Sequence, residues 1–279
     1  MQSETKQRFE QLKKHLNLYG RAAVAFSGGL SSAFLLRTAQ DVLSQKDVLA
    51  ITAISLSFPE EERLRSQALI REWGINQIFI ETEFWKEAAK HDARRCTACH
   101  EELFDKILKA ALERGFDLVL EGSTSDDPVS DAKVGGNGGM LVRPLAQAGL
   151  TKNHLREIAK AEGWSLYDLP SNACLISRFP PGVEITPTAL ARIDRAETLL
   201  RNLGFSQVRV RDHGELARVE IDLEEWERFN DSRLRNMVYI GLKNLGFTYS
   251  CLDIKGYRPG SMNEMSEKIQ QSGNEIPLT

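Results

Sequence analysis

The feature that most constrains the fold of this chain is the alternation of short apolar segments with longer amphipathic ones. Apolar runs typical of buried strands are followed by segments in which apolar residues recur at helical spacing. The expected strands lie at 22–26, 47–57, 75–81 and 116–122, and the expected helices at 32–43, 59–74, 100–115 and 152–163. This order predicts an α/β fold, a parallel sheet with helices on both faces. Ligands of such sheets bind at the carboxyl ends of the strands.

The pattern changes at "LYDLPSNACLISRFPPG", where closely spaced prolines interrupt regular structure. Beyond this stretch we expect helices at 186–204 and 231–246 and strands at 206–212, 216–222 and 247–254. Such an order is typical of a smaller C-terminal α+β domain of the open-sheet sandwich type. We therefore expect two domains, 1–180 and 181–279.

Composition excludes several classes of protein. The formal net charge is -3, so there is no global attraction to nucleic acid or to an anionic membrane. No segment approaches the ~20 apolar residues that span a bilayer, and the N-terminus lacks a hydrophobic signal region. We expect a cytoplasmic protein with no membrane or nucleic-acid partner. Its four cysteines are too few for a disulfide scaffold and are expected to be thiols or ligands.

A glycine-rich junction, Ser27-Gly28-Gly29, joins the first expected strand to a helix. Glycines allow a sharp turn and a close approach of the backbone to a ligand, and the start of a helix attracts anions. The same three residues are equally compatible with a plain strand-to-helix turn. The position after the first strand of a parallel sheet favours a phosphate site. The junction lacks the spaced third glycine of the dinucleotide fingerprint and the Gly-Lys-Ser/Thr of the Walker loop.

This junction resembles the Ser-Gly-Gly-x-Asp-Ser signature of the PP-loop ATP pyrophosphatases, with Ser31 standing where that family has aspartate. Further motifs follow in order between residues 20 and 264: "RRCTACHEELF", "EGSTSDD", "RPLAQAGLTKNHLREIA", "LPSNACLISRFPPG", "VRVRDHGELARVEI" and "GYRPGSMNE". In this combination they are similar to the motifs of the LarE-type sacrificial sulfur transferases. The resemblance implies an adenine nucleotide α-hydrolase-like fold for the first domain and a substrate-binding or oligomerisation role for the second.

The resemblance also implies a reaction. In that family ATP, with Mg²⁺, activates a carboxylate of a pyridine mononucleotide as an adenylate and pyrophosphate is released. A protein sulfur then displaces AMP, and the thiocarboxylate serves the synthesis of the nickel-pincer nucleotide cofactor. A homo-oligomer, a hexamer in the family, is implied as well. Two alternatives stay open: a tRNA sulfurtransferase, for which the sequence shows no basic RNA-binding extension, and a non-catalytic nucleotide-binding protein, which Ser31 suggests.

Cys174 matches the sulfur-donor cysteine of the family. A lone cysteine is more often a buried structural thiol, but the surrounding motif reverses that weighting. Arg178, four residues on, would favour the thiolate electrostatically. The resemblance implies a thioester at Cys174, followed by C–S cleavage that leaves dehydroalanine.

Cys96 and Cys99 have the C-x-x-C spacing of metal or cluster ligands. Together with Cys174 they would supply the three cysteines through which some members of the family are thought to hold a [4Fe-4S] cluster. The same spacing suits a redox pair or two ordinary thiols. Cys251 lies in an expected strand and is predicted to be in the core.

The other candidate residues are polar and lie after strands or at helix starts. The nucleotide-binding residues are expected to be Ser27, Gly28, Gly29, Ser31, Ser32, Gly122, Ser123, Thr124 and Lys152, with Asp126 and Asp127 as Mg²⁺ ligands. Arginines alternate on the second-domain hairpin, which by itself indicates an exposed basic sheet face. The resemblance makes Arg209, Arg211 and Arg258 binding residues for the phosphate of the mononucleotide. Glu197 and Glu220 are predicted to bind metal or orient substrate, although such residues are more often surface ion-pair partners.

Overall fold

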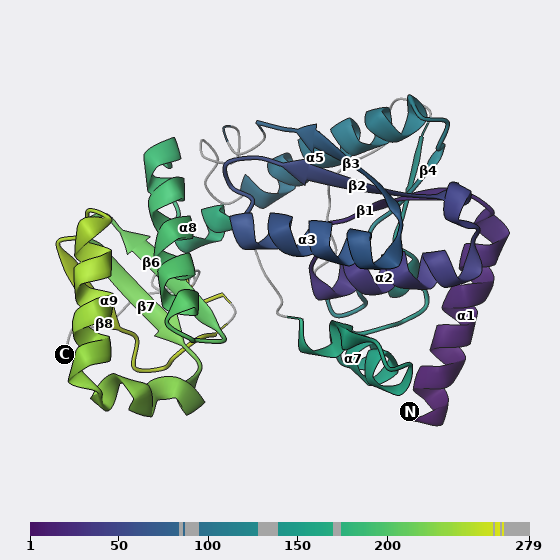
Figure 1. Ribbon diagram of the computed structural model, residues 1–279. Coiled ribbons are helices and arrows are strands. Elements are labelled where there is room, and N and C mark those ends of the chain that lie inside the picture. Colours follow the sequence, from purple (N-terminus) through teal and green to yellow (C-terminus); the bar gives the residue numbers. More distant parts are fainter. Residues whose placement is uncertain are drawn as a thin grey trace, which may run out of the picture. The chain divides into compact units, whose positions relative to one another are not determined.

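The computed structural model describes residues 1–83, 86, 95–127, 139–169, 174–258, 260–262 and 264, and only the backbone of 95–98. The chain forms two compact units, Met1–Glu87 with Arg94–Asn172 and Ala88–Ala93 with Ala173–Thr279. We call them the first and the second unit and describe each by itself (Figure 1). None of the helices in the described residues has the length and apolar character needed to cross a membrane.

The first unit is built on a five-stranded sheet of order β3-β2-β1-β4-β5, in which every pair is parallel. Its strands are β1 (Ala22–Ala25), β2 (Val48–Ile54), β3 (Asn76–Glu81), β4 (Leu118–Leu120) and β5 (Met140–Val142). The parallel sheet is thus confirmed. The sequence had not indicated β5, because three residues are too few to show a period. Since β1 and β4 are neighbours, the loops that follow them leave the same edge of the sheet.

Helices cover both faces of this sheet, as Figure 1 shows, with α2 and α3 on one face and α5 on the other. The alternation of side chains along β1 explains this arrangement. Ala22 and Val24 belong to the core formed with α1, α2 and α7, while Ala23 packs with Phe104 and Ile107 of α5. The helices are α1 (Ser3–Tyr19), α2 (Leu30–Val42), α3 (Glu60–Trp73), α5 (Arg95–Leu112), α6 (Pro144–Gln147) and α7 (Lys152–Ala161), with 3₁₀ turns η1 (Gln45–Asp47) and η2 (Ser165–Asp168).

The second unit contains a three-stranded mixed sheet of order β6-β7-β8, which confirms the smaller α+β architecture. Strands β6 (Val208–His213) and β7 (Leu216–Ile221) form an antiparallel hairpin, and β8 (Tyr249–Leu252) pairs parallel with β7. Helix α8 packs on β6, and α9 packs on α8 and β8. The remaining bounds are α8 (Pro187–Asn202), α9 (Ser232–Asn244), η3 (Leu175–Arg178) and η4 (Leu223–Asn230).

The expectation that Cys251 lies in the core is wrong. Its side chain is exposed. The reason is the sheet order: β8 is an edge strand, and Tyr249 and Ser250 beside Cys251 are exposed as well. Membership of a strand predicts burial only when the strand is covered on that face.

Candidate functional site

The loop between β1 and α2 is held by its own serines. The Ser27 and Ser32 hydroxyls lie 3.2 Å apart, and the Ser32 hydroxyl donates to the Gly29 carbonyl oxygen at 3.2 Å. Helix α2 begins at Leu30, and no side chain of the described residues caps its first turn. The N–H groups at the start of a helix lack intrahelical partners, so those of α2 are oriented for an anion.

Two glycines are required here by close packing of the backbone. Gly28 has φ +80°, and a Cβ there would lie 3.0 Å from the backbone nitrogen of Ser66 on α3. A Cβ on Gly122 would lie 2.9 Å from the backbone nitrogen of Ser32. The loop after β4 therefore touches the first turn of α2, which brings two of the predicted nucleotide-binding segments together. Whether these glycines also approach a ligand stays a prediction.

A cluster of polar side chains follows Gly122 in the loop after β4 and includes the start of α7. It consists of Thr124, Asp126, Asp127 and Lys152. The single Thr124 hydroxyl lies within hydrogen-bond distance of both carboxylates, 2.6 Å from Asp126 and 2.7 Å from Asp127. The backbone N–H of Lys152, at the start of α7, donates to Asp126 at 3.2 Å, and the Lys152 ammonium pairs with Asp127. Burial raises the pKa of Asp127, but the bonds from Lys152 and Thr124 outweigh burial and lower it. Both carboxylates are therefore oriented by protein donors, and their Mg²⁺ role stays a prediction.

A buried carboxylate that sequence reasoning missed, Glu121, lies directly after β4. It accepts hydrogen bonds from the Ser123 hydroxyl at 2.6 Å, Arg143 Nε at 2.7 Å and His100 Nε2 at 3.1 Å. Burial raises the pKa of Glu121, yet these three donors outweigh burial and hold it at about 2. Its position at the carboxyl end of an apolar strand was the available signal. Its partner Arg143 could not be found in the same way, because β5 was not indicated.

Replacing Glu121 with glutamine is expected to destabilise the protein at neutral pH by about 3 kcal/mol, because the folded pKa lies well below the ordinary 4.5. A lowered folded pKa contributes stability that is complete above the unfolded pKa and is lost as pH falls through the folded one. The stability difference between wild type and Glu121→Gln should therefore shrink between about pH 4.5 and pH 2. Urea unfolding across this range measures it, and a difference independent of pH would contradict the assignment.

In the second unit, Cys174 is exposed and precedes the short turn η3. Its carbonyl oxygen accepts three hydrogen bonds: from the Ser177 backbone at 3.1 Å, the Ser177 hydroxyl at 2.9 Å and Arg178 Nη1 at 3.0 Å. Arg178 was predicted to favour the thiolate. The structure shows it bonded to the backbone of Cys174, so it fixes the residue that carries the thiol, and its effect on the thiolate stays a prediction.

Arg178 is itself fixed by Glu197 of α8. The two side chains are fully buried and form a two-pronged ion pair, Nε to Oε1 at 2.8 Å and Nη2 to Oε2 at 3.1 Å. Glu197 also accepts from Arg201 at 2.8 Å and from the backbone N–H of Val210 on β6 at 3.1 Å. Burial raises the pKa of Glu197, but the charge of Arg178 outweighs burial and holds it at about 2. These contacts favour a positioning role for Glu197, and its metal role stays a prediction.

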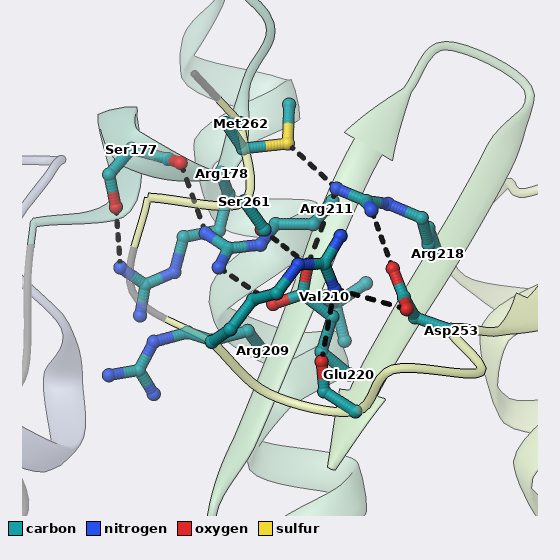
Figure 2. A network of polar contacts seen from close by, with 12 residues as sticks. Ser177, Arg178, Arg209, Val210, Arg211, Arg218, Glu220, Asp253, Ser261 and Met262 are labelled. Carbon is teal, nitrogen blue, oxygen red and sulfur yellow. Dashed lines mark hydrogen bonds and ion pairs between the residues drawn. The ribbon is translucent and has the colours of Figure 1, made fainter. Parts of the chain in front are cut away.

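One face of the β6–β7 hairpin carries charged side chains and is nevertheless buried (Figure 2). Arg211 donates to the carbonyl oxygen of Ser177 at 3.1 Å and to Glu220 at 2.7 Å, and Glu220 accepts from the Ser261 hydroxyl at 2.5 Å. Glu220 and Arg211 are 0% and 5% exposed. A chain of contacts thus runs from Ser261 through the sheet to the turn of Cys174. Glu220 is occupied by these donors, and its predicted metal role remains untested.

Arginines outnumber carboxylates in this network, as far as the described residues show. Arg178, Arg201, Arg209, Arg211 and Arg218 lie with Glu197, Glu220 and Asp253. Burial lowers the pKa of Arg209 to about 10, and repulsion by Arg178 contributes. The network is therefore suited to an anionic ligand. Arg258 joins it only through Asp253, which it shares with Arg218, and it also bonds Glu264 at 2.6 Å.

The described residues contain no group of three or more ligating His, Cys, Asp or Glu side chains. Cys99 is half-buried in the first unit and Cys174 belongs to the second unit. The side chain of Cys96 lies outside the described residues. The cluster prediction is therefore neither confirmed nor contradicted.

The parallel sheet, the uncapped start of α2 and the polar loops at the same edge define an α/β protein with a nucleotide-binding type of fold, followed by a small C-terminal domain.

No family model matches the chain. It is 36% identical over 269 residues to slr1717 of Synechocystis sp., across 94% of this chain and 98% of that protein. It is 31% identical over 260 residues to the pyridinium-3,5-bisthiocarboxylic acid mononucleotide synthase of Lactiplantibacillus plantarum, across 90% of this chain and 91% of the synthase. The chain belongs to the family of this synthase, the LarE type.

Proposed function

We propose that the protein is an ATP-dependent sulfur transferase that converts a carboxylate of a pyridine mononucleotide into a thiocarboxylate, for synthesis of the nickel-pincer nucleotide cofactor. The observation that carries the proposal is the relationship to the synthase along 90% of the chain. The first unit would bind ATP, and the second would bind the mononucleotide and support a homo-oligomer, a hexamer by resemblance. The substrate and mechanism are inferred from the family, and the geometry supports them at the points below.

The first step is adenylation. The carboxylate oxygen attacks the α-phosphorus of ATP, the bond to the β-phosphate oxygen breaks, and pyrophosphate leaves. The Ser27–Ser32 loop and the start of α2 would hold the phosphates, with Ser123 and Lys152 nearby in the same unit.

The donor set after β4 fits Mg²⁺, which proteins commonly hold through one or two carboxylates together with substrate phosphates. Asp126 and Asp127 would be those carboxylates, since Thr124 and Lys152 already orient them. Bound Mg²⁺ would neutralise charge on the departing pyrophosphate.

The second step is sulfur transfer from Cys174. The exposed thiolate attacks the acyl carbon of the adenylate and displaces AMP, which gives a thioester. Removal of the α-proton of Cys174 then expels the thiocarboxylate by breaking the Cβ–Sγ bond, and dehydroalanine remains. The arginine-rich face with Arg209 and Arg211 is proposed to bind the phosphate of the mononucleotide, because guanidinium groups bind phosphate oxygens through charge-assisted hydrogen bonds.

Two measurements test the proposal as a whole. Pyrophosphate release should require both ATP and a carboxylated pyridine mononucleotide, and mass spectrometry of Cys174 should show a loss of about 34 Da, the mass of H₂S, per turnover. Several turnovers at unchanged protein mass, with bound iron and broad visible absorption, would favour a cluster on Cys96, Cys99 and Cys174 as the sulfur source. ATP binding without any pyrophosphate release would favour the non-catalytic alternative that Ser31 suggests.

Replacing Ser31 with aspartate is expected to raise the rate of pyrophosphate release and to lower the Mg²⁺ concentration that it needs. A carboxylate is a stronger Mg²⁺ ligand than a hydroxyl, whereas phosphate binding by the loop backbone does not depend on this side chain. ATP affinity should change by no more than about tenfold, roughly 1.4 kcal/mol. A Mg²⁺ titration of rate and ATP affinity measures both, and an unchanged Mg²⁺ requirement would show that position 31 takes no part in placing the metal.

A further inference from the structure

The carboxyl ends of β4 and β5 carry a charged cluster that the proposed mechanism does not use. Glu121 follows β4 and Arg143 follows β5, and the two strands pair in register with Leu120 opposite Val142. The backbone N–H of Glu121 continues the ladder by donating to the Val142 carbonyl oxygen at 2.8 Å. The two charged side chains therefore start from adjacent positions at the edge where ligands of a parallel sheet bind.

The carboxylate of Glu121 is fully occupied within the protein. It is 7% exposed, with Arg143 Nε on one oxygen and both the Ser123 hydroxyl and His100 Nε2 on the other. Because the carboxylate is ionised, His100 must donate its Nε2 proton to it. Glu121 is therefore largely engaged by protein donors, and its bond to Nε fixes the direction of Arg143.

The guanidinium of Arg143 has hydrogen-bond donors that Glu121 does not use, on Nη1 and Nη2. Among the described residues, Glu121 accepts from Arg143 Nε, and none accepts a hydrogen bond from Nη1 or Nη2. The side chain is 27% exposed, so these groups reach solvent. A guanidinium held through Nε presents its two Nη groups in a set direction, which is the geometry that binds two oxygens of a phosphate.

The residue next to Glu121 lies against the start of helix α2. Gly122 packs so closely on the first turn of α2 that a Cβ would lie 2.9 Å from Ser32 N and 3.1 Å from the Ser31 carbonyl carbon. The Glu121–Ser123 segment is thus in contact with the helix start to which the proposed function assigns the ATP phosphates. Strand β4 is also the direct neighbour of β1, from which that loop emerges.

We infer that Arg143 is a phosphate-binding residue of the nucleotide site that contacts the leaving pyrophosphate, and that Glu121 is the positioning residue that aims it. The inference rests on the proposed function in one respect, that the loop after β1 binds ATP. Beside the loop, the guanidinium of Arg143 would be a fixed cation that stays bound to pyrophosphate while negative charge develops on the pyrophosphate.

Isothermal titration of the full chain with inorganic pyrophosphate, and separately with ATP, tests the inference. Arg143→Gln should weaken pyrophosphate binding about tenfold, and Arg143→Lys should weaken it less, because the charge remains and the fork is lost. Arg114→Gln is the matched control. Arg114 is an exposed arginine at the opposite, amino-terminal end of β4, and its replacement should leave the affinity within about twofold.

The positioning role of Glu121 is tested by a double-mutant cycle. Glu121→Gln should weaken pyrophosphate binding in the wild-type background and have no further effect in the Arg143→Gln background, an affinity pattern that a loss of stability alone would not produce. If the wild type binds pyrophosphate and Arg143→Gln binds it equally well, the inference is overturned and the proposed function is not. The same holds if Arg143→Gln raises only the KM of the carboxylated acceptor, because Arg143 would then bind that carboxylate. Failure of the wild type to bind either ATP or pyrophosphate would overturn the proposed function as well.

Discussion

Replacing Cys174 with alanine is expected to abolish sulfur transfer while pyrophosphate release persists. In the proposed mechanism adenylation takes place in the first unit and precedes the thiol step, so removing the thiol should leave the acyl adenylate without its nucleophile. Thiocarboxylate product should fall below detection, and the protein should no longer lose about 34 Da. Product analysis and intact-protein mass spectrometry in the same reaction measure both effects.

Cys251→Ala is the matched control, because Cys251 is also an exposed thiol of the second unit. It should transfer sulfur at the wild-type rate and lose the same mass. Loss of pyrophosphate release in Cys174→Ala would contradict the order of the two steps. Full sulfur transfer by Cys174→Ala would show that another sulfur is the donor.

Replacing Glu197 with alanine is expected to destabilise the second unit by about 3–5 kcal/mol, since it leaves the guanidinium of Arg178 buried without its two-pronged partner. The same change removes the acceptor for the backbone N–H of Val210 on the edge strand β6. Because Arg178 bonds the carbonyl oxygen of Cys174, the turn that carries Cys174 should loosen too. Urea unfolding followed by tryptophan fluorescence measures the loss of stability.

Glu224→Ala provides the comparison, because Glu224 is an exposed glutamate of the same unit and its removal should cost less than about 0.5 kcal/mol. A Glu197→Ala protein as stable as the wild type would contradict the structural role of the pair. If Glu197 were instead a metal ligand without a structural role, its replacement would leave stability unchanged and would change the Mg²⁺ dependence of pyrophosphate release, which a Mg²⁺ titration of that rate measures.

The sequence was sufficient for most of the fold, because the patterns involved are local. Buried strands and amphipathic helices differ in the period of their apolar residues, which can be read within a few turns. The strand before Ser27 and the helix after Gly29 could be placed in this way, and a parallel sheet followed from the alternation. Strand β5 could not be placed, because a strand of three residues is too short to show a period.

The candidate site was predictable only where a motif marks it. Ser27–Ser32 and Cys174 belong to such motifs, and the resemblance that they carry is confirmed at the level of the family. Glu197 and Glu220 were singled out as residues that bind metal or orient substrate, but their burial was not foreseen, since glutamates are seldom buried unless paired. Glu121 and Arg143 had no motif role assigned to them, and their pairing depends on the sheet order.

What the sequence determined by itself is therefore the set of elements, the class of fold and the residues that could carry the chemistry. The tertiary structure alone decided which of these residues meet: Arg143 with Glu121 across 22 positions, Arg178 with Glu197 across 19, and Ser261 with Glu220 across 41. The physical reason is that helix and strand periods arise from neighbours along the chain, whereas the pairing of buried charges is set by strand order and by burial. A buried guanidinium must find a carboxylate, but spacing along the sequence does not say which one.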